Sequence, residues 1–150
     1  MKVVIQRVSE SSVMINKKVV GEIGLGFLIL LGIEESDTDK DIDWLCHKIN
    51  GLRVFSDNEG KMNLDIHQVN GEFLVISQFT LHAMTKKGFR PSFIKAAKPE
   101  TAIPLYEKFK AKLHEISNLK VEAGEFGADM KISLINDGPV TIIIDTKNKE

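Results

Sequence analysis

Phe27-Leu28-Ile29-Leu30-Leu31 is the longest apolar stretch of the 150-residue chain, and the fold expected here is built around it. Neither face of an extended segment of this composition suits water, so a strand buried on both faces is predicted. Gly24 and Gly26 punctuate the chain just before the stretch. Its five residues are far too few to cross a bilayer, so no membrane contact is expected.

Patterns on both sides of this strand predict the remaining elements. Apolar residues at helical spacing predict two helices, one beginning at residue 37 or 38 and ending near 50, the other beginning at 99 or 100 and ending near 116. Further strands are predicted at residues 2–8, 13–20, 52–55, 73–79, 121–126, 131–135 and 140–144. Turns are predicted at Asn16-Lys17, 56–60 and Asn70-Gly71, a long loop at 82–98 and a frayed tail at 146–150.

Length and composition are typical of one globular domain over residues 1–150. The chain is 43% hydrophobic and 27% charged, which argues against disorder. The element pattern predicts an α+β domain with two main helices and mostly antiparallel strands. Cys46 is the single cysteine and cannot form an internal disulfide, and Arg7 interrupts the apolar core that a signal peptide needs, so a cytoplasmic location is expected.

The histidines give no metal-binding spacing. They are His47, His67, His82 and His114, and none lies in a His-x-x-x-His or Cys-x-x-Cys arrangement. The glycine-containing segment 21–26 lacks the Lys-Ser/Thr ending of a phosphate-binding loop, so it favours a turn between strands. We therefore expect neither a metal nor a cofactor.

Hydroxyl side chains stand at the end of a predicted apolar strand, in Ser77-Gln78-Phe79-Thr80-Leu81. At a strand end they can face a cleft, where a hydroxyl attacks an ester or positions water and the N–H groups of Phe79 and Thr80 stabilise an oxyanion. The alternative is that Ser77 and Thr80 only satisfy local hydrogen bonds. On an extended chain His82 would share a face with Thr80, which leaves a Thr–His pair open as nucleophile and base.

Asn136-Asp137-Gly138-Pro139-Val140-Thr141 is predicted to contain a tight connection between two strands. Glycine tolerates unusual backbone angles, and the Gly138–Pro139 peptide is one of the bonds that can be cis. An ordinary turn with a trans proline is the alternative.

The region from Lys86 to Lys98 holds five basic residues and no acidic one, although the net charge of the chain is −1. Such a run suits phosphate groups, and a solvated loop is the alternative.

The two motifs at 77–81 and 136–141 together resemble the paired motifs of the D-aminoacyl-tRNA deacylase family, and the resemblance covers nearly the whole chain. The further matching segments are Ile5-Gln6-Arg7-Val8, Gly21-Glu22-Ile23-Gly24, Phe55-Ser56-Asp57, Gly60-Lys61-Met62-Asn63-Leu64, Arg90-Pro91-Ser92-Phe93 and Phe126-Gly127-Ala128-Asp129-Met130. The chain departs mildly from the family pattern at His82-Ala83-Met84 and at Lys86-Lys87, which make this loop less acidic and more basic.

This resemblance implies a barrel-like homodimer that hydrolyses the ester joining a D-amino acid, or glycine, to the 3′ end of tRNA. It implies that Gly138 and Pro139, joined by a cis peptide, enter the partner's pocket, where they exclude an L side chain by steric conflict. Arg7 would hold that segment through backbone carbonyls.

The resemblance also implies which residues form the site. Ser77, Gln78, Phe79 and Thr80 would line the catalytic pocket, with Thr80 orienting groups while the 2′-hydroxyl of the tRNA assists. The expected contacts to the terminal adenosine and the tRNA phosphates are Phe126, Gly127, Met130, Ala102, Lys86, Lys87 and Arg90.

Two other functions remain open from the sequence. One is a non-catalytic nucleic-acid-binding dimer of the same fold, which intact motifs at 77–80 and 138–139 argue against. The other is an esterase for small molecules, which would leave the basic loop and Phe126 without a purpose. Release of amino acid from D-aminoacyl-tRNA but not from L-aminoacyl-tRNA separates these from the main hypothesis.

Overall fold

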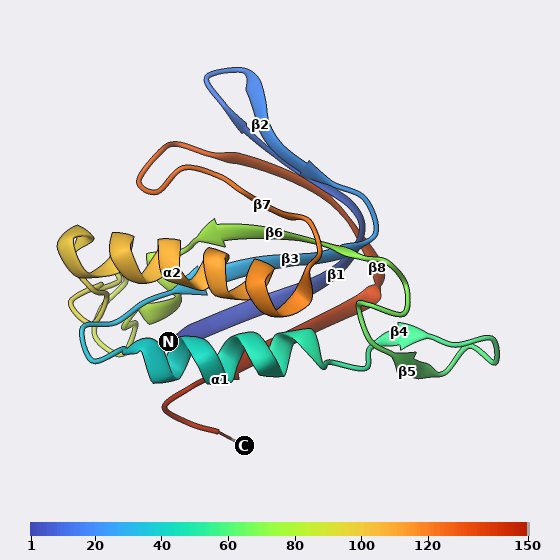
Figure 1. The fold of residues 1–150 in the computed structure, drawn as a ribbon. Coiled ribbons are helices and arrows are strands. Elements are labelled where there is room, and N and C mark those ends of the chain that lie inside the picture. Colours follow the sequence, from blue (N-terminus) through green and yellow to red (C-terminus); the bar gives the residue numbers. More distant parts are fainter. Residues whose placement is uncertain (150) are drawn as a thin grey trace.

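The computed structural model describes residues 1–149 and shows two helices packed on one face of a mixed, strongly bent β-sheet (Figure 1). The helices are α1 (Asp39–Asn50) and α2 (Pro99–Ser117), with a short 3-10 helix η1 (Phe79–His82). The strands are β1 (Lys2–Ile15), β2 (Lys18–Ile23), β3 (Gly26–Gly32), β4 (Phe55–Ser56), β5 (Met62–Leu64), β6 (Glu72–Ser77), β7 (Val121–Ala123) and β8 (Lys131–Asp145). None of the helices in this described part has the length and apolar character needed to span a membrane.

The main sheet has the order β2-β1-β3-β6-β7, and β8 pairs along the other edge of β1. The pairs that β1 makes with β2, β3 and β8 are antiparallel, whereas β3–β6 and β6–β7 are parallel. Strand β2 bends back toward β7, so closely that a Cβ added to Gly21 would lie 2.9 Å from the carbonyl oxygen of Ala123. The sheet is therefore nearly closed, and the α+β, barrel-like fold with mostly antiparallel strands is confirmed.

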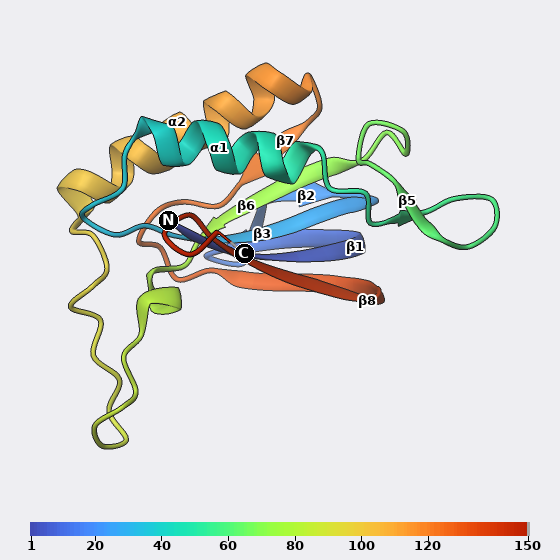
Figure 2. The ribbon, with the colours of Figure 1, turned by 90° about the horizontal axis from the view of Figure 1, so that it is seen from below.

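Strand β3 lies inside the sheet and buries both faces, as its apolar sequence predicts. Phe27, Ile29 and Leu31 point into the large core beneath the helices, while Leu28 joins a smaller cluster on the opposite face. Figure 2 shows the helices on one side of the sheet only, and a long loop that leaves the sheet on the other side.

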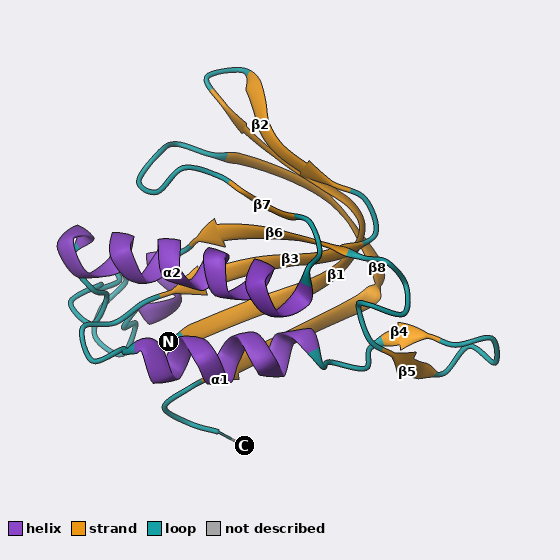
Figure 3. Cartoon of the chain, in the orientation of Figure 1, coloured by secondary structure: helices purple, strands orange, loops and turns teal. Residues whose placement is uncertain are grey.

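Two segments predicted as pairs of strands are single long strands. Residues 2–15 form β1 without a break, which joins the predicted strand 2–8 to the first part of the predicted strand 13–20, and residues 131–145 form β8, drawn as one long strand in Figure 3. In both cases the partner strand pairs with residues on either side of the break that the sequence predicts, with register shifts between Gln6 and Glu10. The strand predicted at 52–55 is displaced to β4, β5 is additional, and β7 ends at Ala123.

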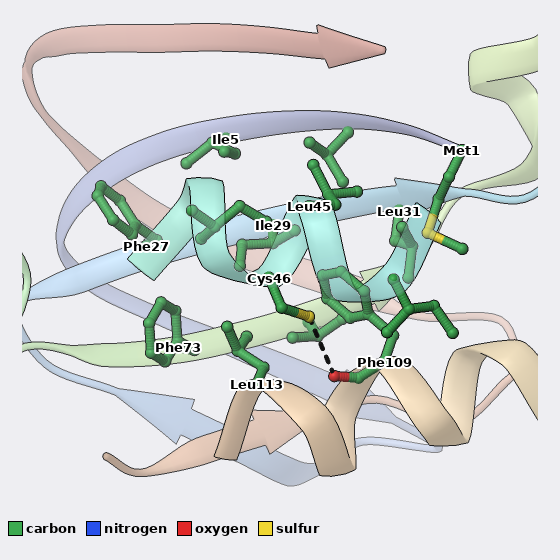
Figure 4. Close-up of a cluster of buried hydrophobic side chains, with 14 of the residues drawn as sticks. Met1, Ile5, Phe27, Ile29, Leu31, Leu45, Cys46, Phe73, Phe109 and Leu113 are labelled. Carbon is green, nitrogen blue, oxygen red and sulfur yellow. Dashed lines mark hydrogen bonds between the residues drawn. The ribbon is translucent and has the colours of Figure 1, made fainter. Parts of the chain in front are cut away.

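The large core contains the only cysteine of the chain, Cys46 on α1 (Figure 4). Its thiol lies 3.7 Å from the carbonyl oxygen of Phe109 on α2. Burial raises the pKa of the Cys46 thiol to about 12. This cysteine therefore packs the two helices together and stays protonated at neutral pH.

Residues 146 and 147 are anchored, whereas a frayed tail was predicted from position 146 onward. The backbone N–H of Thr146 donates to the carbonyl oxygen of Met1 at 2.9 Å, and the Lys147 ammonium lies 3.1 Å from the Asp41 carboxylate on α1. The polar side chains of this segment, which predict fraying, instead bind groups at the start of α1. Position 150 of the predicted tail lies outside the described residues.

Candidate active site

A pocket of about 290 Å³ lies at the ends of the parallel strands β3 and β6. The two strands are in register from Gly26 opposite Glu72 to Leu31 opposite Ser77, so both reach the pocket at their carboxyl ends. The lining residues are Leu31, Ile33, Ile76, Ser77, Gln78, Phe79, Ala97, Ala102, Phe126, Gly127, Ala128, Asp129, Met130 and Ile132. Residues from four separate parts of the chain (31–33, 76–79, 97–102 and 126–132) thus meet in one hollow, which is a common position for a ligand site in a parallel arrangement.

The first motif forms one wall of this pocket because β6 ends within it. The backbone N–H of Gln78 donates to the carbonyl oxygen of Leu31 at 2.7 Å, which extends the strand pairing by one residue. Phe79 then begins η1. The sequence predicted a strand that ends at Phe79, whereas β6 ends at Ser77. The Gln78 side-chain amide donates to the Thr80 hydroxyl at 2.5 Å. The change from strand to helix thereby turns Gln78 and Thr80 toward each other.

Two backbone donors at the start of η1 are free. Within residues 1–149, the N–H groups of Phe79 and Thr80 have no acceptor, whereas the next N–H, of Leu81, donates to the Gln78 carbonyl oxygen. The first N–H groups of any helix lack partners within that helix. Since Phe79 lines the pocket, these donors lie at or next to the pocket wall, where a backbone N–H can stabilise an oxygen atom that develops negative charge.

His82 does not form a pair with Thr80. A shared face requires an extended chain, and both residues lie in η1, where successive side chains do not alternate. His82 is buried, with its Nδ1 atom 3.9 Å from the Glu34 carboxylate and its Nε2 atom without a partner among the described residues. The Thr–His hypothesis is therefore wrong in this structure, and Thr80 has no general base beside it.

The opposite wall comes from the segment after β7 and from α2. Phe126 packs edge-on against Tyr106 of α2, with ring centroids 5.9 Å apart. The Tyr106 hydroxyl donates to the Val75 carbonyl oxygen at 2.9 Å, which ties α2 to β6 below the pocket. Ala102 and Met130 complete this mainly apolar wall. An aromatic ring held in this way can present one face to a flat ligand.

Gly138 and Pro139 lie outside this pocket, within β8, and their peptide bond is cis. The pairing of β8 with β1 jumps from Asn136 opposite Val8 to Thr141 opposite Gln6, so residues 137–140 bulge opposite Arg7. The segment is therefore a bulge inside one strand rather than the predicted connection between two. The buried Arg7 Nε atom donates to the Asp137 carbonyl oxygen at 2.9 Å.

The bulge and the pocket stand at opposite ends of β3. Arg7 pairs with Phe27 at one end of that strand, and Ser77 pairs with Leu31 at the other. Four strand residues separate the two points by about 13 Å along the sheet. Gly138 and Pro139, in the middle of the bulge, are both exposed.

The model of the D-Tyr-tRNA(Tyr) deacylase family matches residues 4–145 of this chain, which is nearly its full length. The chain belongs to the D-Tyr-tRNA(Tyr) deacylase family. Over their full lengths, 62% of residues are identical to a D-aminoacyl-tRNA deacylase of Flavobacterium psychrophilum and 58% to one of Akkermansia muciniphila. The resemblance described from the two motifs is thereby confirmed.

Two solved structures share the fold of this family member. A c-Myc DNA unwinding element binding protein is 38% identical, with a TM-score of 0.90, and the match covers 97% of this chain and 98% of the other. A second structure, described as a probable eukaryotic D-amino acid tRNA deacylase, is only 15% identical but has a TM-score of 0.83, with coverage of 95% and 97%. The second likeness concerns the fold alone.

The predicted contact residues of this deacylase-family chain divide into two groups. Ser77, Gln78 and Phe79 line the pocket, as do Ala102, Phe126, Gly127 and Met130, and Thr80 reaches it through Gln78. Lys86, Lys87 and Arg90 lie apart from it, on the long loop between η1 and α2. Phe93 connects the two groups, because its ring packs edge-on against Phe79 at 5.0 Å.

Some pocket residues of this family member were not predicted. They are Leu31, Ile33, Ile76, Ala97, Ala128, Asp129 and Ile132. Most are apolar residues whose sequence pattern is that of an ordinary strand or helix, so only their place at the ends of β3, β6 and β8 reveals the role. No cluster of three or more His, Cys, Asp or Glu side chains able to hold a metal ion is present among residues 1–149.

Proposed function

We propose that this protein hydrolyses the ester bond of D-aminoacyl-tRNA, releasing free tRNA and the D-amino acid. The observation that carries the proposal is the pocket at the ends of β3 and β6, which brings Phe79, at the start of η1 where two backbone N–H groups lack acceptors among residues 1–149, together with the apolar wall that contains Phe126. Membership of the deacylase family supports the same reaction.

The chemistry that these residues support is attack by water, or attack assisted by the 2′-hydroxyl of the terminal ribose, on the ester carbonyl carbon. Negative charge then develops on the carbonyl oxygen, and the N–H groups of Phe79 and Thr80 stabilise it. The leaving 3′-oxygen of the ribose takes up a proton and departs as the hydroxyl of free tRNA. Thr80 has no adjacent base, so we assign it an orienting role through its hydrogen bond with Gln78.

Phe126 supplies the contact for the terminal adenosine in this proposal. RNA-binding sites commonly stack an unpaired base on an aromatic side chain. The edge-on contact with Tyr106 fixes the orientation of the ring, and Ala102 and Met130 border the same wall. The adenosine would therefore place its ribose, and the ester on it, toward Ser77 to Thr80.

A homodimer with composite sites completes the proposal. Within residues 1–149, the outer edge of β8 has no strand partner, although it is long and exposes Leu134, Ile135 and Ile143. An unpaired edge with exposed apolar side chains is a typical surface for association. The bulge at 137–140 lies at the far end of β3 from its own pocket, and this separation supports a role for the exposed Gly138 and Pro139 in a partner's pocket.

Chirality selection then follows from the backbone of the bulge. Main-chain atoms of Gly138 and Pro139 would surround the α-carbon of the substrate and leave no space for an L side chain. Glycine has no side chain to exclude, so glycyl-tRNA should be cleaved as well. Arg7 holds the bulge through the Asp137 carbonyl oxygen, and the cations at 86, 87 and 90 meet tRNA phosphates. We place this activity in the cytoplasm, where aminoacyl-tRNA is used.

Non-catalytic nucleic-acid binding is the second candidate function. It is favoured by the similarity to the c-Myc DNA unwinding element binding protein, whose described role is binding DNA. The two functions differ in one measurable respect, because only the first consumes an ester.

Incubation with D-tyrosyl-, L-tyrosyl- and glycyl-tRNA tests the proposal. We expect release of D-tyrosine and glycine, with L-tyrosyl-tRNA left intact. Release of all three amino acids would refute chirality selection but leave hydrolysis standing. Binding of tRNA with no release of any amino acid would favour the second candidate, and cleavage of a small ester in preference to D-tyrosyl-tRNA would indicate a general esterase.

A further inference from the structure

Residues 84–92 form a finger that leaves the body of the protein next to the pocket. Met84 and Ser92 close its base through two backbone hydrogen bonds of 2.8 and 3.0 Å, and Gly88 turns the chain at the tip with a φ of +66°. Phe93 anchors the base against Phe79 of the pocket wall. In Figure 2 the finger extends away from the sheet, on the side opposite the helices.

The cations of the finger have no carboxylate partners. Lys86, Lys87 and Arg90 form no ion pair within residues 1–149, and the finger contains no acidic residue. Many lysines elsewhere do pair with acids, among them Lys108 with Asp39 and Lys147 with Asp41. The positive charge of the finger is therefore uncompensated and available to phosphates.

Phe89 is the feature that distinguishes this finger from an ordinary basic loop. Its side chain is fully exposed, with a relative accessibility of 107%, and it stands between Lys87 and Arg90 at the tip. A free phenylalanine ring among cations combines the two elements of single-stranded nucleic-acid recognition, a stacking surface for bases and charges for the backbone. A duplex offers no unstacked base to such a ring, so the arrangement favours unpaired nucleotides.

We infer that the finger binds unpaired nucleotides that adjoin the 3′-terminal nucleotide of the RNA, with Phe89 stacking on a base and Lys86, Lys87 and Arg90 meeting phosphates. The inference rests on the proposed function, which puts the terminal nucleotide in the pocket beside Phe79. Phe93 joins that pocket to the base of the finger, so a strand that leaves the pocket passes along it. The finger would thus require an RNA whose 3′ end is single-stranded.

The test measures binding of the full chain to an uncharged RNA hairpin with an unpaired 3′ overhang, and to the same hairpin with a blunt end, by fluorescence anisotropy. We expect Phe89→Ala to weaken binding of the overhang RNA by about 5- to 150-fold, the effect of losing one base–aromatic stack. Binding of the blunt hairpin and the salt dependence should not change. Phe89 is fully exposed, so its removal leaves the core intact.

The charges give an independent readout. The combined Lys86→Ala, Lys87→Ala, Arg90→Ala variant should reduce the slope of log K against log salt by about 2, from a contribution of about 0.7 for each single-strand phosphate. Lys17→Ala with Lys18→Ala is the matched control, because these exposed lysines lie at the β1–β2 turn and form no ion pair in the described chain. Its slope should equal that of the wild type.

Three outcomes would overturn the inference. They are equal binding of overhang and blunt RNA by the wild type, unchanged overhang binding by Phe89→Ala, and a change of oligomeric state in Phe89→Ala by analytical ultracentrifugation. The last outcome would assign the ring to a contact between copies of the chain. If the wild type releases D-tyrosine but Phe89→Ala binds the overhang RNA as tightly as the wild type, only the inferred role of the finger is refuted. If overhang binding depends on Phe89 but no amino acid is released, only the proposed reaction is refuted.

Discussion

At the scale of single residues, the surroundings of Thr80 bear most directly on the mechanism. A threonine in a pocket motif suggests a nucleophile, yet its hydroxyl accepts a hydrogen bond from Gln78 and makes none with a histidine or carboxylate among residues 1–149. An unactivated hydroxyl is a poor nucleophile. The free N–H groups of Phe79 and Thr80 are backbone atoms, so substitution of the Thr80 side chain leaves them in place.

Thr80→Ala should therefore slow hydrolysis of D-tyrosyl-tRNA by no more than about tenfold, well below the ~10²–10⁴ contributed by a group that transfers protons. Single-turnover kinetics at saturating enzyme measure this, and tRNA affinity measured separately is the control. A complete loss of hydrolysis with intact tRNA binding would restore Thr80 as a nucleophile.

Gly138 is the second residue on which the proposal depends. Its φ is +127°, and an added Cβ would lie 2.8 Å from Arg7 Nη2 and 3.0 Å from Val140 Cγ2. We expect Gly138→Ala to lower the free energy of unfolding by about 1–3 kcal/mol, the usual cost of an unfavourable backbone region. Deacylation should fall too, because the bulge must shift.

Urea denaturation measures this loss, and Gly60→Ala is the matched control. Gly60 also has a positive φ, of +77°, but nothing lies within 4 Å of an added Cβ. In Gly60→Ala only the unfavourable backbone conformation should lower the free energy of unfolding, because no neighbouring atom is displaced. This control should retain deacylase activity. Equal activity in Gly138→Ala and the wild type would show that the bulge does not contribute to the site.

At the scale of elements, the start of α1 is held by a carboxylate rather than by helix propensity alone. The Asp41 carboxylate accepts hydrogen bonds from the Thr38 backbone N–H at 2.9 Å and from Lys147 at 3.1 Å. Partial burial would raise the pKa of Asp41, but the hydrogen bonds from Thr146, Thr38 and Lys147 outweigh burial and lower it. The N-terminus of the helix is thus joined to the chain beyond β8.

Asp41→Asn should destabilise the protein near pH 7 by about 1 kcal/mol, as loss of a capping interaction does. The folded-state pKa of Asp41 lies below its unfolded value of about 3.9, so the stabilisation is present above that value and disappears as pH falls through the folded pKa. Urea denaturation at pH 7 and at successively lower pH values below 4 should therefore show a difference that narrows progressively as the folded-state pKa is approached. Asp43→Asn, at an exposed position of the same helix, should change stability little at either pH. A constant difference at all pH values would contradict the assignment.

At the scale of the whole molecule, the two motifs are about 13 Å apart along β3, and in the proposed function each pocket takes its bulge from the partner chain. Mixed dimers test this directly. A Gln78→Ala chain lacks a pocket residue, and a Gly138→Ala chain lacks the intact bulge. In the mixed dimer one site carries both defects, whereas the other combines an intact pocket with an intact bulge.

We therefore expect co-expressed, doubly tagged mixed dimers to recover about half of the wild-type deacylase activity when both homodimers are inactive. The measurement is deacylation of D-tyrosyl-tRNA by dimers purified through both tags. If each site were built within one chain, the mixed dimer would contain no intact site and would be as inactive as its parents.

The sequence by itself determined the elements whose patterns are local and the family to which the chain belongs. Phe27 to Leu31 predicts a strand buried on both faces because its period is visible without neighbours, and both helices begin and end close to where their caps stand. The motif at 77–80 predicts a pocket wall because strand ends and hydroxyl side chains are features of the chain itself.

Only the tertiary structure decided where the two motifs stand. The composition around Gly138 is typical of a turn, yet pairing with the long strand β1 on either side keeps β8 a single strand. The short helix η1 contains both Thr80 and His82, which would share a face only on an extended chain. The second pocket wall at Phe126 is joined to Ser77 through contacts between residues distant in sequence. Such pairings depend on which strands meet in the sheet, and that is a property of the packed molecule rather than of any segment.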